Sequence, residues 1–326
     1  MARRMNEQQW IQTFIHPRGD QTDPTTGPGD DAALFQAPQG SSSVISVDCL
    51  VSGQHFLYDW LLDWHPPEVL ATRLLRGSLS DLSAMGATAS GLLLSLECEE
   101  LPGYFGESFW NTVDEELRSC SVKLLGGNVT RSSGSLALHA TVVGHVVADR
   151  CWRRDRAQTG DWIGVSGRPG KAAQALAQLR KGEVLPKDDP WRSPACRQQF
   201  ARQLGKKLQK PATAIDLSDG LGLDLQRVCL ASHVSAEIDL TDLASARNAP
   251  THEQIIGGGE DYELLLAIDP GDIATVDQVA EETGTPFTWI GRMTEPGSEN
   301  PQPSWKSRGK EIIPETSLTG WDPFRS

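Results

Sequence analysis

The sequence predicts an α/β protein of two domains, with the boundary near residue 150. Short apolar stretches of strand-like length alternate with longer stretches of helical spacing, which is typical of layered α/β domains. A chain of 326 residues is long enough to bury two hydrophobic cores. A basic, polar segment at 149–160 interrupts the alternation. We therefore expect one domain at 1–150 and a second at 151–326.

The first half should open with a helix and continue with alternating strands and helices. Trp10, Ile11 and Phe14 recur at helical spacing, and a loop rich in Pro and Gly follows them. A run of leucines with helical spacing begins after Pro66-Pro67, and Gly86 marks its expected end. The expected elements are helices at 5–15, from Pro66-Pro67 to Gly86 and at 109–117, and strands at 32–35, 43–49, 91–96 and 136–147.

The strand expected at 43–49 has two chemically different faces. Ile45 and Val47 alternate with Ser46 and Asp48 along it. Successive side chains of a strand point to opposite faces, so the apolar pair and the polar pair separate. We expect the apolar face to be buried and Asp48 to lie at the end of the strand on its polar face.

The second half also alternates strands and helices. The expected strands are at 162–166, 212–216, 236–240, 262–268 and 287–293, and the expected helices at 171–181, 195–208, 221–230 and 273–282. The tail at 294–320 is rich in Pro, Gly and Ser, which predicts a loop with one short strand. Trp321 and Phe324 then suggest that the tail folds back onto the protein.

Charge and composition narrow the classes of partner. The formal charge of −13 argues against nucleic acid, whose phosphates are bound by clustered Lys and Arg. No apolar run approaches the ~18 residues that a membrane span needs. The six cysteines form no C-x-x-C pair, which favours reduced thiols over disulfides or a zinc site. We expect a soluble cytoplasmic protein without a membrane partner.

Carboxylates recur where apolar segments begin or end, which suggests magnesium and phosphate chemistry. Glycines beside them let the backbone approach an anion closely, and Gly126-Gly127-Asn128 repeats this device. Other interpretations stay open: a solvated turn at the first site, a helix N-cap at Ser218 or Asp219, and a flexible turn at 257–259. The carboxylate sites are Gly27-Pro28-Gly29-Asp30-Asp31-Ala32-Ala33, Ser46-Val47-Asp48, Ser80-Asp81, Asp216-Leu217-Ser218-Asp219-Gly220 and Gly257-Gly258-Gly259-Glu260-Asp261.

Two common nucleotide-binding motifs are absent, and two histidines are interpreted as structural. Gly170-Lys171 lacks both the earlier glycine and the following hydroxyl of a P-loop. The glycine spacing at 27–32 matches the G-x-G-x-x-A motif of dinucleotide-binding proteins. However, no strand precedes it, and its two carboxylates would repel a pyrophosphate. His139 and His145 share a strand face without further ligands at metal spacing.

The motifs together resemble the thiamine-monophosphate kinase family, which belongs to the superfamily of aminoimidazole ribonucleotide synthetase and selenophosphate synthetase. The resemblance covers nearly the whole chain, in order and at similar spacing. The motifs that carry it are Gly29-Asp30-Asp31-Ala32-Ala33, Ser46-Val47-Asp48, Gly53-Gln54-His55-Phe56, Leu79-Ser80-Asp81-Leu82-Ser83-Ala84-Met85-Gly86-Ala87, Gly126-Gly127-Asn128-Val129-Thr130-Arg131, Asp216 to Leu221 and Gly258-Gly259-Glu260-Asp261-Tyr262-Glu263-Leu264.

The resemblance implies a fold, a reaction and a set of site residues. The N-terminal domain would bind ATP and Mg²⁺ and pair its sheet with that of a second subunit to form a barrel, and the C-terminal layered α/β domain would complete the substrate cleft. The reaction would be the ATP-dependent phosphorylation of thiamine monophosphate to thiamine diphosphate by a homodimer. The implied metal ligands are Asp31, Ser46, Val47 through its carbonyl, Asp48, Asp81, Asn128, Asp216 and Asp219. The implied ATP contacts are Gly127, Asn128, Arg154 and Ser218, the implied substrate contacts are His55, Glu260 and Trp321, and the residues expected to act in catalysis are Asp48, Asp81 and Arg154.

Three departures from the family pattern bear on these roles. Asn128 stands where the family has Asp, so one negative charge is lost although an amide oxygen can still ligate Mg²⁺. Ser78 replaces an Asn. The segment around Arg154 also differs, which leaves Arg153 as an alternative ATP contact. A second hypothesis is therefore an inactive or weakly active paralogue that senses nucleotide or thiamine phosphate, and a third is another kinase or ligase of the superfamily.

Overall fold

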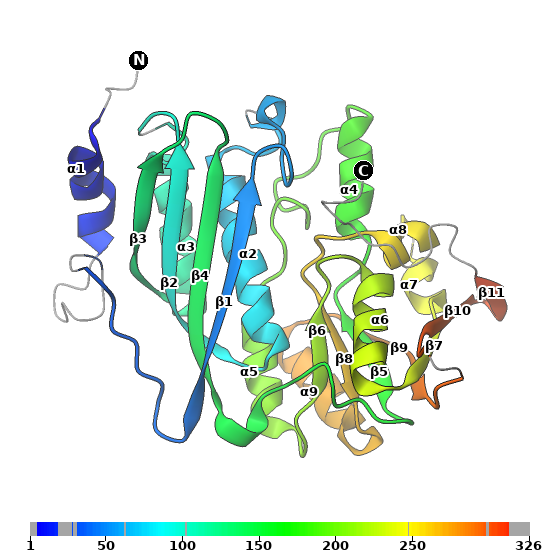
Figure 1. Ribbon diagram of the computed structural model, residues 1–326. Helices are drawn as coiled ribbons and strands as arrows, with labels where there is room; N and C mark the ends of the chain where they lie inside the picture. Colours follow the sequence, from blue (N-terminus) through cyan, green and yellow to red (C-terminus); the bar gives the residue numbers. More distant parts are fainter. Residues whose placement is uncertain are drawn as a thin grey trace. The chain divides into compact units, whose positions relative to one another are not determined.

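The chain forms two compact units in a computed structural model that describes residues 5–18, 28, 31–61, 63–101, 103–246, 248–297 and 300–312. The first unit comprises Met1–Leu82 and Thr88–Val146, and the second comprises Ser83–Ala87 and Val147–Ser326. Each unit has its own sheet and its own helices (Figure 1). No helix among the described residues is both long and apolar enough to cross a membrane.

The first unit is a four-stranded sheet with two long helices on one face (Figure 1). The strand order is β1-β4-β2-β3; β2 runs antiparallel to β4 and parallel to β3. A helix joins the two parallel strands, as such a crossover requires. The elements are β1 (Ser41–Val51), α2 (Pro67–Ala84), β2 (Thr88–Cys98), α3 (Glu107–Cys120), β3 (Lys123–Arg131) and β4 (Ala137–Val147).

The N-terminal segment packs beside α3. It consists of α1 (Glu7–Trp10), a π-helical turn (Ile11–Ile15) and a 3₁₀ turn (His16–Arg18). The Trp10 indole N–H donates to the carbonyl of Phe105 at 3.0 Å. The Trp10 and Trp110 rings pack edge to face, with their centroids 5.7 Å apart. Arg18 pairs with Asp114 of α3 at 2.7 Å. The N-terminal residues are thus part of the first unit's packing.

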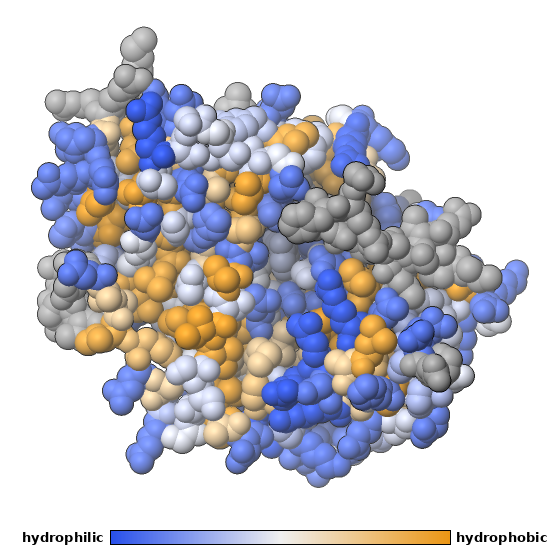
Figure 2. Space-filling view, in the orientation of Figure 1, coloured by the Kyte–Doolittle hydropathy of each residue, from blue (hydrophilic) through white to orange (hydrophobic). Residues whose placement is uncertain are grey.

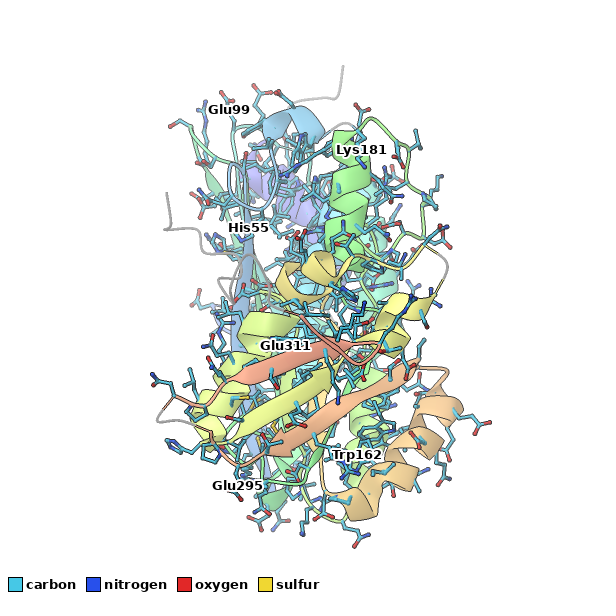
Figure 3. The ribbon with its side chains drawn as sticks, turned by 90° about the vertical axis from the view of Figure 1, so that its right-hand side faces the viewer. His55, Glu99, Trp162, Lys181, Glu295 and Glu311 are labelled. Carbon is cyan, nitrogen blue, oxygen red and sulfur yellow. The ribbon has the colours of Figure 1, made fainter. Side chains whose placement is uncertain are left out.

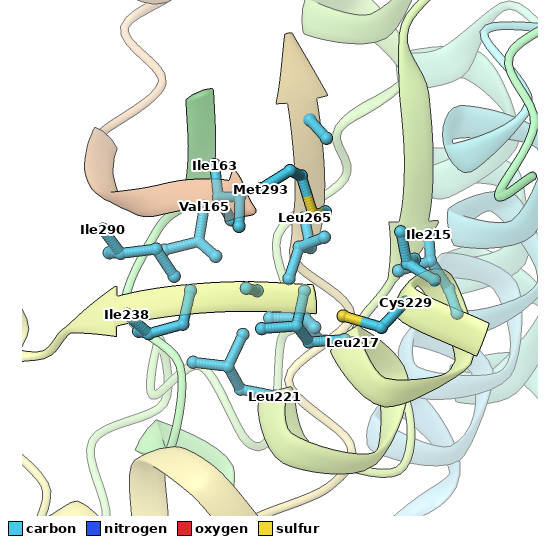
Figure 4. Close-up of a cluster of buried hydrophobic side chains, with 14 of the residues drawn as sticks. Ile163, Val165, Ile215, Leu217, Leu221, Cys229, Ile238, Leu265, Ile290 and Met293 are labelled. Carbon is cyan, nitrogen blue, oxygen red and sulfur yellow. The ribbon is translucent and has the colours of Figure 1, made fainter. Parts of the chain in front are cut away.

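The second unit is a layered sheet of seven strands in the order β11-β10-β7-β9-β5-β8-β6. One hydrophobic cluster lies between this sheet and α6, and Figure 4 shows its side chains. A second cluster joins the sheet to α5 and α9. The strands are β5 (Trp162–Ser166), β6 (Thr213–Asp216), β7 (Ser235–Asp239), β8 (Leu264–Ile268), β9 (Phe287–Thr294), β10 (Pro303–Ser307) and β11 (Lys310–Ile312). The helices are α4 (Lys171–Arg180), α5 (Gln198–Lys207), α6 (Leu221–Ser232), α7 (Thr241–Ser245), α8 (His252–Gly257) and α9 (Ile273–Thr283).

Most of the predicted helices and strands are present, with several corrections. The short buried strand at 32–35 is wrong, because these residues form no strand and Leu34 is 67% exposed. The strand at 43–49 exists as β1, but its faces are reversed. Ile45 and Val47 are 64% and 67% exposed, whereas Leu50, on the face of Ser46 and Asp48, is buried. The tail contains two strands, β10 and β11, instead of one. The sequence analysis did not predict β3, α7 and α8.

Candidate active site

A cavity of about 380 Å³ in the first unit gathers three of the predicted site residues. Asp31, Gly127 and Asn128 line it, together with Trp10 and other apolar side chains. Both Asp31 and Asn128 are exposed residues. The predicted metal ligand Asp31 and two of the predicted nucleotide contacts, Gly127 and Asn128, thus line the same cavity.

The two glycines of this cavity lie in a strand that the sequence analysis did not predict. β3 runs through Gly126-Gly127-Asn128. A Cβ atom on Gly127 would lie 1.8 Å from the carbonyl oxygen of Leu94, so only glycine allows β3 to lie this close to β2. Gly126 has a φ of +155° and follows a register shift in the β2–β3 pairing. The glycines therefore permit close strand pairing and leave Asn128 on an exposed stretch of β3.

Ser46, Asp48 and Asp81 belong to β1 and α2. The Ser46 hydroxyl donates a hydrogen bond of 2.5 Å to Asp81 Oδ2, so the structure brings this predicted pair together. Asp48 lies on the same face of β1 as Ser46, and its Oδ1 accepts the Cys49 N–H at 2.7 Å. Val47 points to the opposite face. Any contact of Val47 with a metal would therefore use its carbonyl.

His55, labelled in Figure 3, lies in the turn after β1. The Val51 N–H donates to His55 Nδ1 at 3.0 Å. A ring nitrogen that accepts this bond carries no proton, so the proton lies on Nε2. His55 can therefore present an N–H donor, which suits contact with an anionic oxygen.

In the second unit, two of the predicted motifs meet at one edge of the sheet. β8 is antiparallel to both β5 and β6, so its first residues lie beside the last residues of those strands. The Glu260 N–H donates to the Ser218 carbonyl at 2.8 Å, and the Tyr262 N–H donates to the Leu217 carbonyl at 2.9 Å. The segment that ends β6 and the segment that begins β8 are thus joined through their backbones. Asp216, the last residue of β6, is 8% exposed.

Asp219 is held by two residues that the sequence analysis did not single out. Arg227 Nη1 lies 2.6 Å from Asp219 Oδ2 and 2.6 Å from Asp224 Oδ1. Asp224 Oδ2 also accepts the Asp219 N–H at 3.0 Å. Asp224 is fully buried, and this burial raises its pKa to about 6. The helical spacing between Asp224 and Arg227 was the signal available in the sequence.

The alternative interpretation, in which Ser218 or Asp219 is the N-cap of α6, is not observed. Gly220 occupies the N-cap of α6 without a side-chain capping bond. Asp219 instead points its carboxylate at the guanidinium of Arg227. The Arg227 guanidinium thus lies beside Asp219, a predicted metal ligand, where a metal ion would otherwise bind.

Asp261 and Glu263 are buried and paired inside the second unit. Asp261 accepts the N–H groups of Gly170 at 2.6 Å and Ala172 at 2.9 Å. Its burial raises its pKa to about 7. Glu263 receives two bonds from Arg197, at 2.6 and 2.7 Å. Both acids bind protein groups, so Glu260 is the acid of this motif that stays partly exposed.

The two arginines that the sequence left as alternatives differ in their engagement. Arg153 forms a two-bond pair with Asp155, at 2.9 and 2.6 Å. The Arg154 side chain is exposed and makes no hydrogen bond or ion pair within the part of the chain that the structure describes. Arg154 is thus the better placed of the two to receive a phosphate.

The predicted metal ligands suit Mg²⁺ by their chemistry. They offer carboxylate, hydroxyl, amide and carbonyl oxygens, which are the donors that hard cations prefer. Among the described residues, no three His, Cys, Asp or Glu side chains converge closely enough to hold a metal ion. The structure brings together two smaller groups, Ser46 with Asp81 and Asp31 with Asn128, whereas Asp216 and Asp219 are neighbours along the chain at the end of β6. Asp30 and Trp321 lie outside the described residues.

Comparison with known proteins identifies the family. Residues 29–146 match the model of the AIR synthase related protein, N-terminal domain, and residues 159–302 match that of the AIR synthase related protein, C-terminal domain. Thiamine-monophosphate kinase of Salmonella typhimurium is 34% identical over 294 residues, covering 86% of this chain and 88% of that protein. The Escherichia coli (strain K12) enzyme of the same name is 36% identical over 298 residues, with the same coverage.

Solved structures agree with these sequence matches. The crystal structure of thiamine-monophosphate kinase from Stenotrophomonas maltophilia aligns with a TM-score of 0.72 at 29% identity, covering 87% of this chain and 90% of that one. A structure of AaThiL complexed with AMPPCP and TMP aligns with a TM-score of 0.66 at 25% identity, covering 90% of both chains. The hydrogenase maturation protein HypE in complex with ATP shares the fold, with a TM-score of 0.74 at 16% identity. The chain therefore belongs to the thiamine-monophosphate kinase family of AIR synthase related proteins.

Proposed function

We propose that this protein transfers the γ-phosphoryl group of ATP to thiamine monophosphate, forming ADP and thiamine diphosphate. The observation that carries this proposal is the match over 90% of both chains to a relative complexed with AMPPCP and TMP. The relatives at 34% and 36% identity have the same name. Asp31 and Asn128 in the cavity of the first unit, and the acidic sheet edge of the second unit, supply groups suited to this chemistry.

The reaction needs positioning and charge neutralisation more than proton removal. The acceptor is an ionised phosphate oxygen, so no general base has to activate it. When bound, Mg²⁺ would neutralise phosphate charge and polarise the transferred group. We assign its ligands to Asp31, Asn128, Ser46, the Val47 carbonyl, Asp48, Asp81, Asp216 and Asp219. In this proposal the first unit has the ATP- and Mg²⁺-binding role, and the second unit contributes residues that contact the substrate.

Protein cations and donors would complete the charge balance. Arg154 contributes a permanently charged guanidinium without a protein partner among the described residues. His55 offers its Nε2–H to a phosphate oxygen of the substrate, because its Nδ1 is occupied by the Val51 amide. Glu260 would face the cationic thiazolium ring or accept from the aminopyrimidine. Gly127 and Ser218 would contact ATP, and Trp321 would stack on the thiamine rings.

A second copy of the chain would cover the exposed face of the first sheet. Ile45 and Val47 of β1 are 64% and 67% exposed, and Figure 2 shows hydrophobic residues gathered on this face of the first unit. Apolar side chains grouped on one sheet face mark an interaction surface. We assign it to a homodimer whose paired sheets form a barrel. All six cysteines are free thiols, which agrees with a protein that functions in the reducing environment of the cytoplasm.

A coupled assay for ADP tests the function. Purified protein with Mg²⁺, ATP and thiamine monophosphate should release ADP and form thiamine diphosphate in equal amounts. Thiamine lacks the acceptor phosphate and should release no ADP. Asp81→Asn should abolish turnover while the protein remains folded. Tight binding of thiamine monophosphate without ADP release would refute the kinase proposal and favour the sensor alternative.

A further inference from the structure

A buried carboxylate ties the start of β8 to the start of α4. Asp261 is 8% exposed, and its two oxygens accept the N–H groups of Gly170 and Ala172, at 2.6 and 2.9 Å. These residues lie 91 and 89 positions away in the sequence. They are the N-cap and the second residue of α4, whose N-terminal N–H groups need acceptors. Asp261 thus supplies the cap that the local sequence of α4 lacks.

The residues on either side of Asp261 have an unfavourable backbone conformation. Glu260 has a φ of +65° and Tyr262 a φ of +53°. Residues with a Cβ rarely adopt this left-handed region, and clusters of such residues persist only where the surroundings hold them. Here two of the three consecutive residues are left-handed, with the anchored Asp261 between them. The direction of the Glu260 side chain therefore depends on what holds this segment.

The segment is also packed too closely to shift as a whole. The Glu260 N–H donates to the Ser218 carbonyl at 2.8 Å. A Cβ atom on Gly259 would lie 2.6 Å from the same carbonyl oxygen. Gly170 has a φ of +88°, and a Cβ atom there would meet the backbone of Gln254 at 2.8 Å. Three segments of the second unit are thus in backbone contact, and Asp261 is the side chain that bonds two of them.

We propose that Asp261 is a positioning residue that acts through Glu260 on the binding of the phosphate-acceptor substrate. Its two hydrogen bonds hold Glu260 in the left-handed conformation that sets the direction of the Glu260 carboxylate. This inference rests on the proposed function, in which Glu260 contacts thiamine monophosphate. An Asn at this position has one acceptor oxygen and one NH₂ group, so it can satisfy one of the two backbone donors and repels the other.

Steady-state kinetics of Asp261→Asn test this role. We expect the KM for thiamine monophosphate to rise at least tenfold and the KM for ATP to change less than twofold. Glu260→Gln should raise the KM for thiamine monophosphate by itself. The double variant should show no further increase, because residues that act through one another are not additive. Additive effects, or an equal rise of both KM values, would overturn the proposal.

A matched control separates positioning from general stability. Asp272 is another buried aspartate, 2% exposed, and it accepts the Gln209 N–H beyond the opposite end of β8. Asp272→Asn removes a comparable carboxylate from the turn after β8, and it should leave both KM values within twofold of wild type. A rise in the KM for thiamine monophosphate with this control would show that any buried acid produces the effect.

Amide hydrogen exchange tests the anchor without any assumption about activity. Exchange at 257–262 should accelerate at least tenfold in Asp261→Asn and stay unchanged in Asp272→Asn. If wild-type protein releases no ADP with thiamine monophosphate, the proposed function fails while this readout still reports on the anchor. Unchanged exchange at 257–262 in Asp261→Asn would overturn the anchor itself.

Discussion

Replacing Arg197 with methionine should destabilise the second unit strongly. Arg197 donates two bonds to Glu263, at 2.6 and 2.7 Å, and the two side chains are 12% and 10% exposed. Methionine has a similar volume but no charge, so the substitution leaves a carboxylate that is hardly hydrated. The Ser166 hydroxyl would remain as a donor to it. Breaking a buried ion pair from one side costs about 3–5 kcal/mol, because the remaining charge is uncompensated.

Urea unfolding at pH 7, followed by tryptophan fluorescence, measures this cost. We expect the free energy of unfolding to fall by about 3–5 kcal/mol in Arg197→Met. The matched control is Lys207→Met, because the Lys207–Glu282 pair has a similar distance of 2.6 Å but is 38% and 39% exposed. An exposed pair contributes at most about 1 kcal/mol.

A double variant distinguishes the lost charge balance from lost packing. In Arg197→Met with Glu263→Leu both charges are gone, so most of the stability should return, since apolar replacements of buried pairs are often neutral. The reasoning is refuted if Arg197→Met costs no more than the Lys207 control. It is also refuted if the double variant is less stable than Arg197→Met, because packing would then dominate.

Three further predictions concern pH, metal binding and the family departure. The pKa of Asp261 is raised from 3.8 to about 7, so its contribution to stability is complete below about pH 4 and is lost as the pH rises through 7. Asp261→Asn lacks this titration, so its free energy of unfolding, measured by urea denaturation, should rise relative to that of wild type by about 4 kcal/mol between pH 4 and 8. A difference between the two proteins that does not change with pH would contradict the raised pKa. Arg227→Met removes the cation 2.6 Å from Asp219, so Mg²⁺ should raise the melting temperature at a lower concentration than in wild type, whereas Lys207→Met, with the same change of net charge, should not alter this concentration. Asn128→Asp restores a negative charge to the cavity of the first unit and should keep or raise turnover with a lower Mg²⁺ requirement; a clear loss of turnover would show that Asn128 serves another role.

The order of helices and strands was predictable because local patterns determine it. Leucines at helical spacing define α2, and apolar runs define β5 and β8 in the positions expected. The face that β1 buries was not predictable in this way. Its apolar Ile45 and Val47 are exposed, because the helix side of the sheet takes the face with Ser46 and Asp48. The alternation of apolar and polar residues predicts that the two faces of β1 differ, but only the neighbouring elements decide which face is covered.

The sequence by itself determined which acids form motifs, and the tertiary structure decided what each acid does. Asp219, Asp261 and Glu263 look equivalent as carboxylates near glycines and apolar strands. In the folded unit Asp219 pairs with nearby Arg227, whereas the partners of the other two come from distant segments: the amide of Gly170 for Asp261 and the guanidinium of Arg197 for Glu263. The charge state and the accessibility of a carboxylate depend on such partners and on burial, and neither is encoded within a few residues of the acid.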